Sequence, residues 1–120
     1  QEWIQTLDIR ASSQETNIES LSGGNQQKVV FSRWLDTRAK IMILNEPTRG
    51  VDVGAKVELY RIIDDLCSKG HAVLMFSSEM PELLAISDRI IVLSEGRVTG
   101  EFSAGQATQE KLMTSAIAAL

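Results

Sequence analysis

The stretch "IMILNEPTRGVDVGAK" (residues 41–56) indicates how this chain folds, because one structural pattern gives way to another within it. IMIL is a short, continuous apolar run, which predicts a β-strand buried on both faces of a sheet. The proline and two glycines of NEPTRGVDVG then break the strand. A helix follows and Gly70 ends it. Its apolar side chains recur one or two turns apart, at Val53, Val57, Tyr60, Ile63 and Cys67.

The same alternation continues towards the C-terminus. AVLMF (72–76) predicts a second buried strand, and RIIVL (89–93) predicts a third. Between them, SSEMPELLAIS (77–87) predicts a short helix with Pro81 in its first turn. Strands and helices that alternate at this spacing favour an α/β fold, in which helices flank a sheet of parallel strands.

A hairpin and a last helix are expected beyond the third strand. RVTGEF (97–102) alternates between apolar and polar residues, as the second strand of a hairpin does. Thr108 is placed to cap a final helix. The apolar face of that helix would comprise Leu112, Met113, Ala116, Ile117 and Leu120.

Upstream of the first strand, LSGGNQQK (21–28) joins a polar loop to a helix. Ser22 can cap this helix, and Gly23 and Gly24 would let an anion approach the free N–H groups of its first turn. The helix dipole also favours negative charge there. The alternative is that these residues form only a loop and a cap. One face of the helix is apolar, with Val30, Phe31, Trp34 and Leu35.

Polar residues follow the first two strands, where ligands of parallel sheets bind. Asn45 and Glu46 end the first strand, and Ser77 and Ser78 end the second. A carboxylate such as Glu46 could serve phosphoryl transfer, although both Asn45 and Glu46 could equally be turn residues before a proline. Asn45 lacks the charge of a magnesium ligand and could only accept a hydrogen bond from a metal-bound water.

Residue spacing argues against serine hydrolase chemistry and against a phosphate loop within this chain. A serine nucleophile needs a base, and the one histidine, His71, lies roughly 15–20 Å from the serines at the opposite end of its strand. The phosphate loop G-x-x-x-x-G-K-[ST] does not occur in the 120 residues, and GVDVGAK (50–56) has too few residues between its glycines to form one. Asp52 is a candidate either for a helix cap or for a contact residue.

Composition narrows the choice of partners. The net charge is −4, only 5% of residues are aromatic and no basic run occurs, so we expect no nucleic-acid partner. A single cysteine excludes an internal disulfide and makes a reducing compartment the simpler interpretation. The longest apolar runs are too short to span a membrane, so we expect a soluble protein or part of one.

In this order along the chain, LSGGNQQK, IMILNEPTRGVD, FSSE and DRIIVLSEGRV together resemble the pattern of the ATP-binding-cassette (ABC) ATPases, which comprises a signature motif, a Walker B strand, a D-loop and a switch loop. EPTRGVDVGAK and SSEMPELL are similar to the second nucleotide-binding domain of the tandem ATPase subunits of bacterial monosaccharide importers. The tail GEFSAGQATQEKLM is most similar to the ribose-importer branch. The resemblance covers nearly the whole chain from Leu21 onward.

The resemblance implies a partial P-loop NTPase fold, in which residues 1–120 are the C-terminal half of one nucleotide-binding domain without its P-loop half. It also implies ATP and Mg²⁺ as cofactors, with ATP sandwiched between two such domains. Ser22, Gly23 and Gly24 would then contact ATP held by the other domain, with Asn25 and Gln26 beside them.

On the same resemblance, Glu46 would polarise the attacking water, and Asn45 occupies the position of a magnesium-associated aspartate. Asp52 would lie in the D-loop at the domain interface, and Ser78 occupies the position of the switch histidine. Asn45 and Ser78 would weaken the site around this domain's own P-loop. We therefore expect the chain to act mainly as the trans-acting lid of the other, competent site.

The implied partners are another nucleotide-binding domain, a membrane permease and, indirectly, a sugar-binding protein, with the protein peripheral on the cytoplasmic face of the bacterial inner membrane. We expect the chain alone neither to bind ATP tightly nor to hydrolyse it, and an unpaired strand edge invites self-association. Two alternatives stay open: a soluble ABC protein of translation or repair, and a non-catalytic interaction module.

Overall fold

The computed structural model describes residues 2–37 and 39–118, which form two compact units, residues 1–76 and 77–120. The first unit contains α1 (Glu2–Thr6), the 3₁₀ helix η1 (Ile18–Ser20), α2 (Gly23–Asp36), β1 (Ile41–Asn45), α3 (Val53–Ser68) and β2 (Ala72–Phe76). The second contains α4 (Met80–Ile86), β3 (Arg89–Ser94), β4 (Arg97–Ser103) and α5 (Gln109–Ile117). The predicted α/β fold is confirmed.

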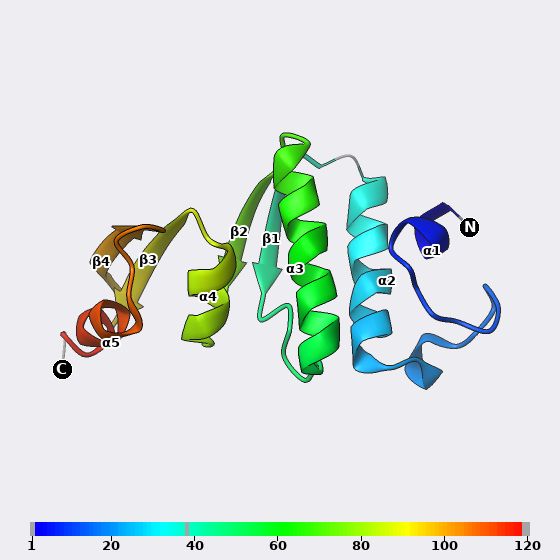
Figure 1. Cartoon of the computed structure of the whole chain (residues 1–120), viewed down its shortest axis with the longest axis horizontal. Helices are drawn as coiled ribbons and strands as arrows, with labels where there is room; N and C mark the ends of the chain where they lie inside the picture. The colour runs from blue at the N-terminus through cyan, green and yellow to red at the C-terminus, as the bar shows by residue number, and fades with distance from the viewer. Residues whose placement is uncertain (1, 38, 119–120) are drawn as a thin grey trace. The chain divides into compact units, whose positions relative to one another are not determined.

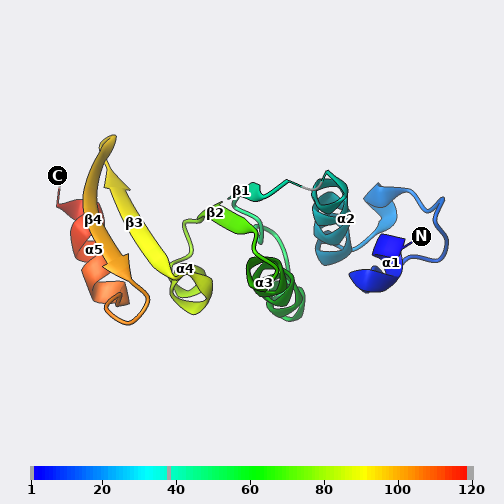
Figure 2. The same ribbon diagram turned by 90° about the horizontal axis from the view of Figure 1, so that it is seen from above.

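A strand–helix–strand unit organises residues 41–76. β1 and β2 pair in parallel from Ile41 opposite Ala72 to Asn45 opposite Phe76, and α3 connects them. Figures 1 and 2 both show α3 on one face of this two-stranded sheet, with α2 beside α3. The crossover brings the carboxyl ends of both strands to one edge, as the sequence pattern predicted.

The prediction that β1 is buried on both faces is wrong for the part of the chain described here. Burial alternates along the strand: Met42 and Leu44 are buried, whereas Ile41 and Ile43 remain 68% and 67% exposed. Leu74 and Phe76 of β2 are exposed as well. The reason is that α3 covers one face of the sheet, and the described residues of this unit place no helix on the other (Figure 2).

The apolar stripe predicted on α2 is buried only in part. Phe31 is 2% exposed and packs into the core, but Val30 and Trp34 remain 42% and 55% exposed. The core of the first unit comprises Leu7, Ile9, Phe31, Met42, Leu44, Val51, Leu59, Ile63 and Leu66. α2 therefore presents one row of apolar side chains to the core and leaves a second row exposed.

In the second unit, β3 and β4 form an antiparallel hairpin from Arg89 opposite Ser103 to Ser94 opposite Arg97. Its two turn residues, Glu95 and Gly96, both have positive φ, as a type I′ turn requires. The predicted hairpin is thus confirmed, but the prediction that β3 is the third strand of the parallel sheet is wrong. A two-residue turn places β4 along β3, and these two strands form a sheet separate from that of β1 and β2.

α5 covers the hairpin, with Leu112 and Ile90 buried between them. Thr108 caps this helix as predicted, since its Oγ1 accepts a hydrogen bond from Lys111 N at 3.3 Å. Met113 and Ile117 remain exposed, which corrects the apolar face predicted for α5, and Leu120 lies outside the described residues.

The helix boundaries follow local sequence signals. Pro81 lies in the first turn of α4 as predicted. α3 ends at Ser68, and Gly70, with φ +90°, allows the chain to reverse into β2. Among the described helices, none is both long and apolar enough to cross a membrane.

Candidate functional site

The start of α2 offers backbone N–H groups to an anion. Ser22 is the N-cap: its Oγ accepts hydrogen bonds from Asn25 N at 3.4 Å and from Asn25 Nδ2 at 2.9 Å. The first intrahelical bond runs from Gln26 N to Ser22 O, so the amides of Gly23 and Gly24 precede it. Ser22 and Gly23 are exposed. This arrangement, with the positive end of the helix dipole, suits a phosphate group.

Gly24 also serves the packing of α2 against α3. It is buried, and a Cβ on Gly24 would lie 2.5 Å from Cβ of Ala55 on α3, closer than two such atoms can approach. A Cβ on Gly23 would lie 3.2 Å from Gly50 O. Contact of Gly24 with ATP stays a prediction, whereas its missing side chain makes room for α3. Only tertiary contacts could reveal this.

Asn25 and Gln26 lie beside the helix start, as predicted, but their side chains are engaged within the protein. Asn25 Oδ1 accepts a hydrogen bond from Arg10 N at 3.0 Å, and Gln26 Nε2 donates to Leu21 O at 2.9 Å. Both amides thus hold the segments that precede α2 against its first turn.

The turn from β1 to α3 lies against the start of α2. Arg49 N donates to Glu46 O, and Val51 N donates to Thr48 O. These bonds form a compact turn in which Thr48 is buried. Gly50 of this turn approaches Gly23, because a Cβ on Gly23 would lie 3.2 Å from Gly50 O. Two segments that are about 25 residues apart in sequence therefore meet at one place.

Asp52 caps α3, because its Oδ1 accepts a hydrogen bond from Ala55 N at 3.0 Å. The capping interpretation of this residue is therefore confirmed. Its side chain is exposed, so a role as a contact residue stays a prediction.

Glu46 combines a carboxylate with an unusual backbone conformation. Its φ is +47°, in the left-handed region that non-glycine residues rarely occupy. Its amide donates to Phe76 O at 2.8 Å, which extends the pairing of the two strands by one residue beyond Asn45. Strained backbone of this kind is often found at functional sites, so the geometry is compatible with the predicted catalytic role.

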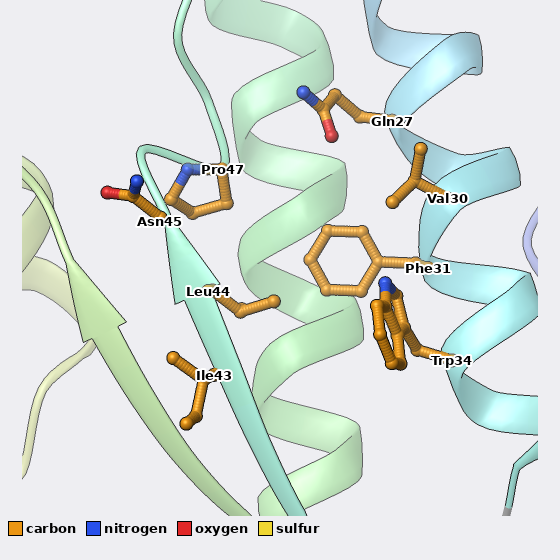
Figure 3. A pocket seen from close by; sticks show the side chains of 8 residues that line it. All are labelled: Gln27, Val30, Phe31, Trp34, Ile43, Leu44, Asn45 and Pro47. Carbon is orange, nitrogen blue, oxygen red and sulfur yellow. The ribbon is translucent and has the colours of Figure 1, made fainter.

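A hollow of about 160 Å³ lies between α2 and β1 (Figure 3). Phe31 and Leu44 point towards each other across it, and Asn45 lies at its rim, at the end of β1. It is lined by Gln27, Val30, Phe31, Trp34, Ile43, Leu44, Asn45 and Pro47. The lining is mostly apolar and carries no charged side chain, so it is unsuited to a triphosphate.

Ser77 and Ser78 lie at the start of the second unit. Ser77 Oγ donates to Glu82 Oε2 at 2.5 Å and accepts a hydrogen bond from Glu79 N at 3.0 Å. Glu82 is only 2% exposed, a burial that the sequence pattern did not reveal because Glu82 reads as a polar residue of a short helix. Ser78 is exposed, and its predicted role in the switch loop stays a prediction.

The described residues do not by themselves form a metal site. No group of three or more His, Cys, Asp or Glu side chains that could hold a metal ion occurs in residues 2–37 and 39–118. Asn45 contributes a neutral, exposed amide at most. The roles of Asn45 and Glu46 towards Mg²⁺ stay predictions.

Comparison with known proteins places these features in a family. The family model for ABC transporters matches residues 1–49. The chain is 54% identical over 116 residues to the xylose import ATP-binding protein of Geobacillus kaustophilus. This match covers 97% of the present chain and 23% of that relative. It is 55% identical over 113 residues to the ribose import ATP-binding protein of Bacillus subtilis, in a match that covers 94% of this chain and 23% of that relative. The chain therefore spans about a quarter of the length of these relatives.

Solved structures agree on the fold. An ATP-binding cassette of an ABC transporter superposes with a TM-score of 0.82 at 21% identity, over 97% of this chain and 47% of that one. A dimeric ATP-binding cassette bound to ADP and inorganic phosphate superposes with a TM-score of 0.74 at 22% identity, over 86% and 44%. The fold is thus that of these cassettes, and the sequence relatives show that the chain belongs to the ATP-binding proteins of ABC transporters.

Proposed function

We propose that this chain acts within the ATP-binding protein of a bacterial sugar importer, where the start of α2 binds the terminal phosphate of ATP held by a partner domain. The observation that carries the proposal is the exposed, neutrally capped helix start formed by Ser22 and Gly23. Its N–H groups and dipole supply what a phosphate needs without a phosphate loop in this chain.

The second part of the proposal concerns hydrolysis. Glu46 polarises the attacking water, while Asn45 and Ser78 make the site around this domain's own nucleotide the weaker of two. ATP and Mg²⁺ are held mainly by residues of other segments, because no phosphate loop G-x-x-x-x-G-K-[ST] occurs in the 120 residues. Because catalysis needs those segments, the isolated chain neither binds ATP tightly nor hydrolyses it.

Partners follow from the same proposal. The relatives are named as ribose, xylose and galactose import proteins, which supports a membrane permease and a sugar-binding protein as the further components. A dimeric ATP-binding cassette among the similar structures supports a second nucleotide-binding domain as the direct partner. The protein would lie at the cytoplasmic face of the membrane, bound to the permease. The isolated chain would self-associate through its exposed apolar strands, β1 and β2.

The test is a chimera in which this chain replaces the matching segment of the ribose import ATP-binding protein of Bacillus subtilis, to which it is 55% identical. Ser22→Asp keeps an N-cap side chain but places a negative charge where the phosphate binds. Ser22→Asn is the matched neutral cap. We expect the rate of ATP hydrolysis to fall about 100-fold in Ser22→Asp, the size of the loss when one donor to a developing anion is removed. The loss in Ser22→Asn should be several-fold smaller than in Ser22→Asp.

Equal hydrolysis rates in the two variants would contradict the proposal, because they would show that the helix start does not face the phosphate. The isolated 120-residue chain serves as a further control, compared with its Glu46→Gln variant. A chimera that assembles with the permease but never hydrolyses ATP would instead favour a non-catalytic interaction module, the function that the neutral Asn45 favours.

A further inference from the structure

Lys28 is a charged residue with almost no contact with solvent. It lies on α2 and is 3% exposed. Its Nζ donates to Glu58 Oε2 on α3 at 2.5 Å and to Asp8 O, in the segment after α1, at 3.0 Å. One ammonium group thus connects three segments that are distant in sequence. A buried ammonium is costly unless such partners are present, so this arrangement needs a reason.

The position of Lys28 suggests that reason. Lys28 lies one helical turn after Gly24, and Glu58 lies three residues after Ala55, so both pairs occupy the facing sides of α2 and α3. The Gly24–Ala55 contact fixes how closely the two helices approach. The Lys28–Glu58 pair adds a directional contact one turn further on, which resists sliding and rotation of α2 against α3.

Glu58 is suited to remain the charged partner. Its side chain is 40% exposed, and the hydrogen bond from Lys28 lowers the pKa of its carboxyl group below the usual value. The carboxylate is therefore ionised at neutral pH and can hold the lysine in one place. The positive charges of Arg10 and Arg61 also lower the pKa of this carboxyl group, but by less.

We propose that Lys28 and Glu58 are positioning residues for phosphate binding by α2: their ion pair orients the start of this helix relative to the turn that carries Glu46 and Asp52. The inference rests on the proposed function of the helix start. Neither side chain contacts the nucleotide; they act through the orientation of Ser22 and Gly23. A small displacement of a binding group is enough to slow a reaction strongly, by about 100-fold for 1 Å.

Lys28→Met separates positioning from stability, because methionine has a similar length and suits an apolar environment. Lys28→Met removes one member of the ion pair, but the Glu58 side chain is 40% exposed, so water can solvate the carboxylate that remains. Methionine supplies no directional contact. Lys28→Arg keeps the charge and the hydrogen bonds. Glu58→Gln keeps a neutral acceptor at a half-exposed position and therefore serves if Lys28→Met does not fold.

The variants are made in the chimera with the Bacillus subtilis ribose import ATP-binding protein, and kcat, KM for ATP and the thermal midpoint are measured. We expect kcat to fall about tenfold in Lys28→Met and about threefold in Glu58→Gln, with KM within about twofold of the parent. Lys28→Arg should recover most of the loss. Lys69→Met is the matched control: it removes a lysine from an exposed ion pair of the same unit and should leave kcat unchanged.

A folded Lys28→Met or Glu58→Gln variant with parental kcat would overturn the inference, and so would a kcat loss in Lys69→Met of equal size. The Ser22 variants distinguish the two proposals. If Ser22→Asp hydrolyses ATP as fast as Ser22→Asn, the proposed function fails. If Ser22→Asp is inactive while the Lys28 and Glu58 variants are fully active, only the positioning role fails.

Discussion

Helices α2 and α3 begin in the same way but offer different surfaces to a ligand. Each has an extended N-cap residue whose side chain accepts a hydrogen bond from the amide three residues later, Ser22 from Asn25 and Asp52 from Ala55. The Ser22 hydroxyl is neutral and leaves the positive end of the α2 dipole available. The Asp52 carboxylate supplies its own negative charge and opposes a second anion. The charge of the cap, rather than its geometry, distinguishes the proposed phosphate site at α2 from the start of α3.

The glycines at the second position of the two helices give the largest expected contrast. Gly24→Ala would place a Cβ 2.5 Å from Cβ of Ala55, whereas Gly54→Ala would meet only Asp52 Oδ1 at 3.4 Å, an ordinary contact. We expect Gly24→Ala to lower the free energy of unfolding by about 2 kcal/mol, as overpacking does. Gly54→Ala should raise it by up to about 1 kcal/mol through helix propensity. Thermal unfolding of the chain, followed by circular dichroism, measures both.

The control for this contrast is the second substitution Ala55→Gly, which removes the atom that Gly24→Ala would meet. The double variant should be more stable than the sum of the two single changes predicts. Additive effects would show that the two helices do not touch at this level.

The segments that lead into the two helices differ as well. Ser22 and Leu21, before α2, have ordinary negative φ values of −60° and −83°, whereas Glu46, before α3, has φ +47°. Glu46→Gly and Glu46→Ala both remove the carboxylate, but only glycine accepts the left-handed conformation without strain. We therefore expect Glu46→Gly to be more stable than Glu46→Ala by about 1 kcal/mol, measured by chemical unfolding. Equal stability of the two would mean that the turn relaxes and stores no strain.

The smallest effect concerns the charge of the α3 cap. Asp52→Asn keeps the capping hydrogen bond but removes the charge that complements the helix dipole. We expect a loss of about 0.3–1 kcal/mol at low ionic strength. Thermal midpoints measured in low and high salt check the cause, because salt screens an exposed charge and should shrink the difference. A difference that persists unchanged in high salt would point to the cap geometry instead.

Local features of the fold were accessible from the sequence. Ser22 and Asp52 are recognised as caps because an N-cap bonds to an amide three residues away, so its signal lies within one short segment. The hairpin after β3 and the end of α3 at Gly70 follow from residues that accept positive φ. The order of strands and helices likewise follows from apolar periodicity, which is written along one element at a time.

Other predictions failed because they depended on neighbours that periodicity does not specify. An apolar run such as IMIL predicts burial, but whether a second helix covers Ile41 and Ile43 depends on segments outside the strand. β3 was expected in the parallel sheet because strands and helices alternate along the chain, yet β3 pairs with β4 in a hairpin. The burial of Lys28 and Glu82 could not be predicted from apolar periodicity, because both are charged residues of amphipathic helices.

The sequence by itself determined the strands and helices from α2 onward, the caps Ser22, Asp52 and Thr108, and the motifs that relate this chain to ABC transporter ATP-binding proteins. Each of these is encoded in a few consecutive residues. The tertiary structure alone decided that Gly24 serves the contact with α3, that Lys28 connects α2, α3 and the segment after α1, and that one face of β1 stays exposed. Those properties arise from contacts between residues far apart in the chain, where packing and the satisfaction of buried charge act only once the elements meet.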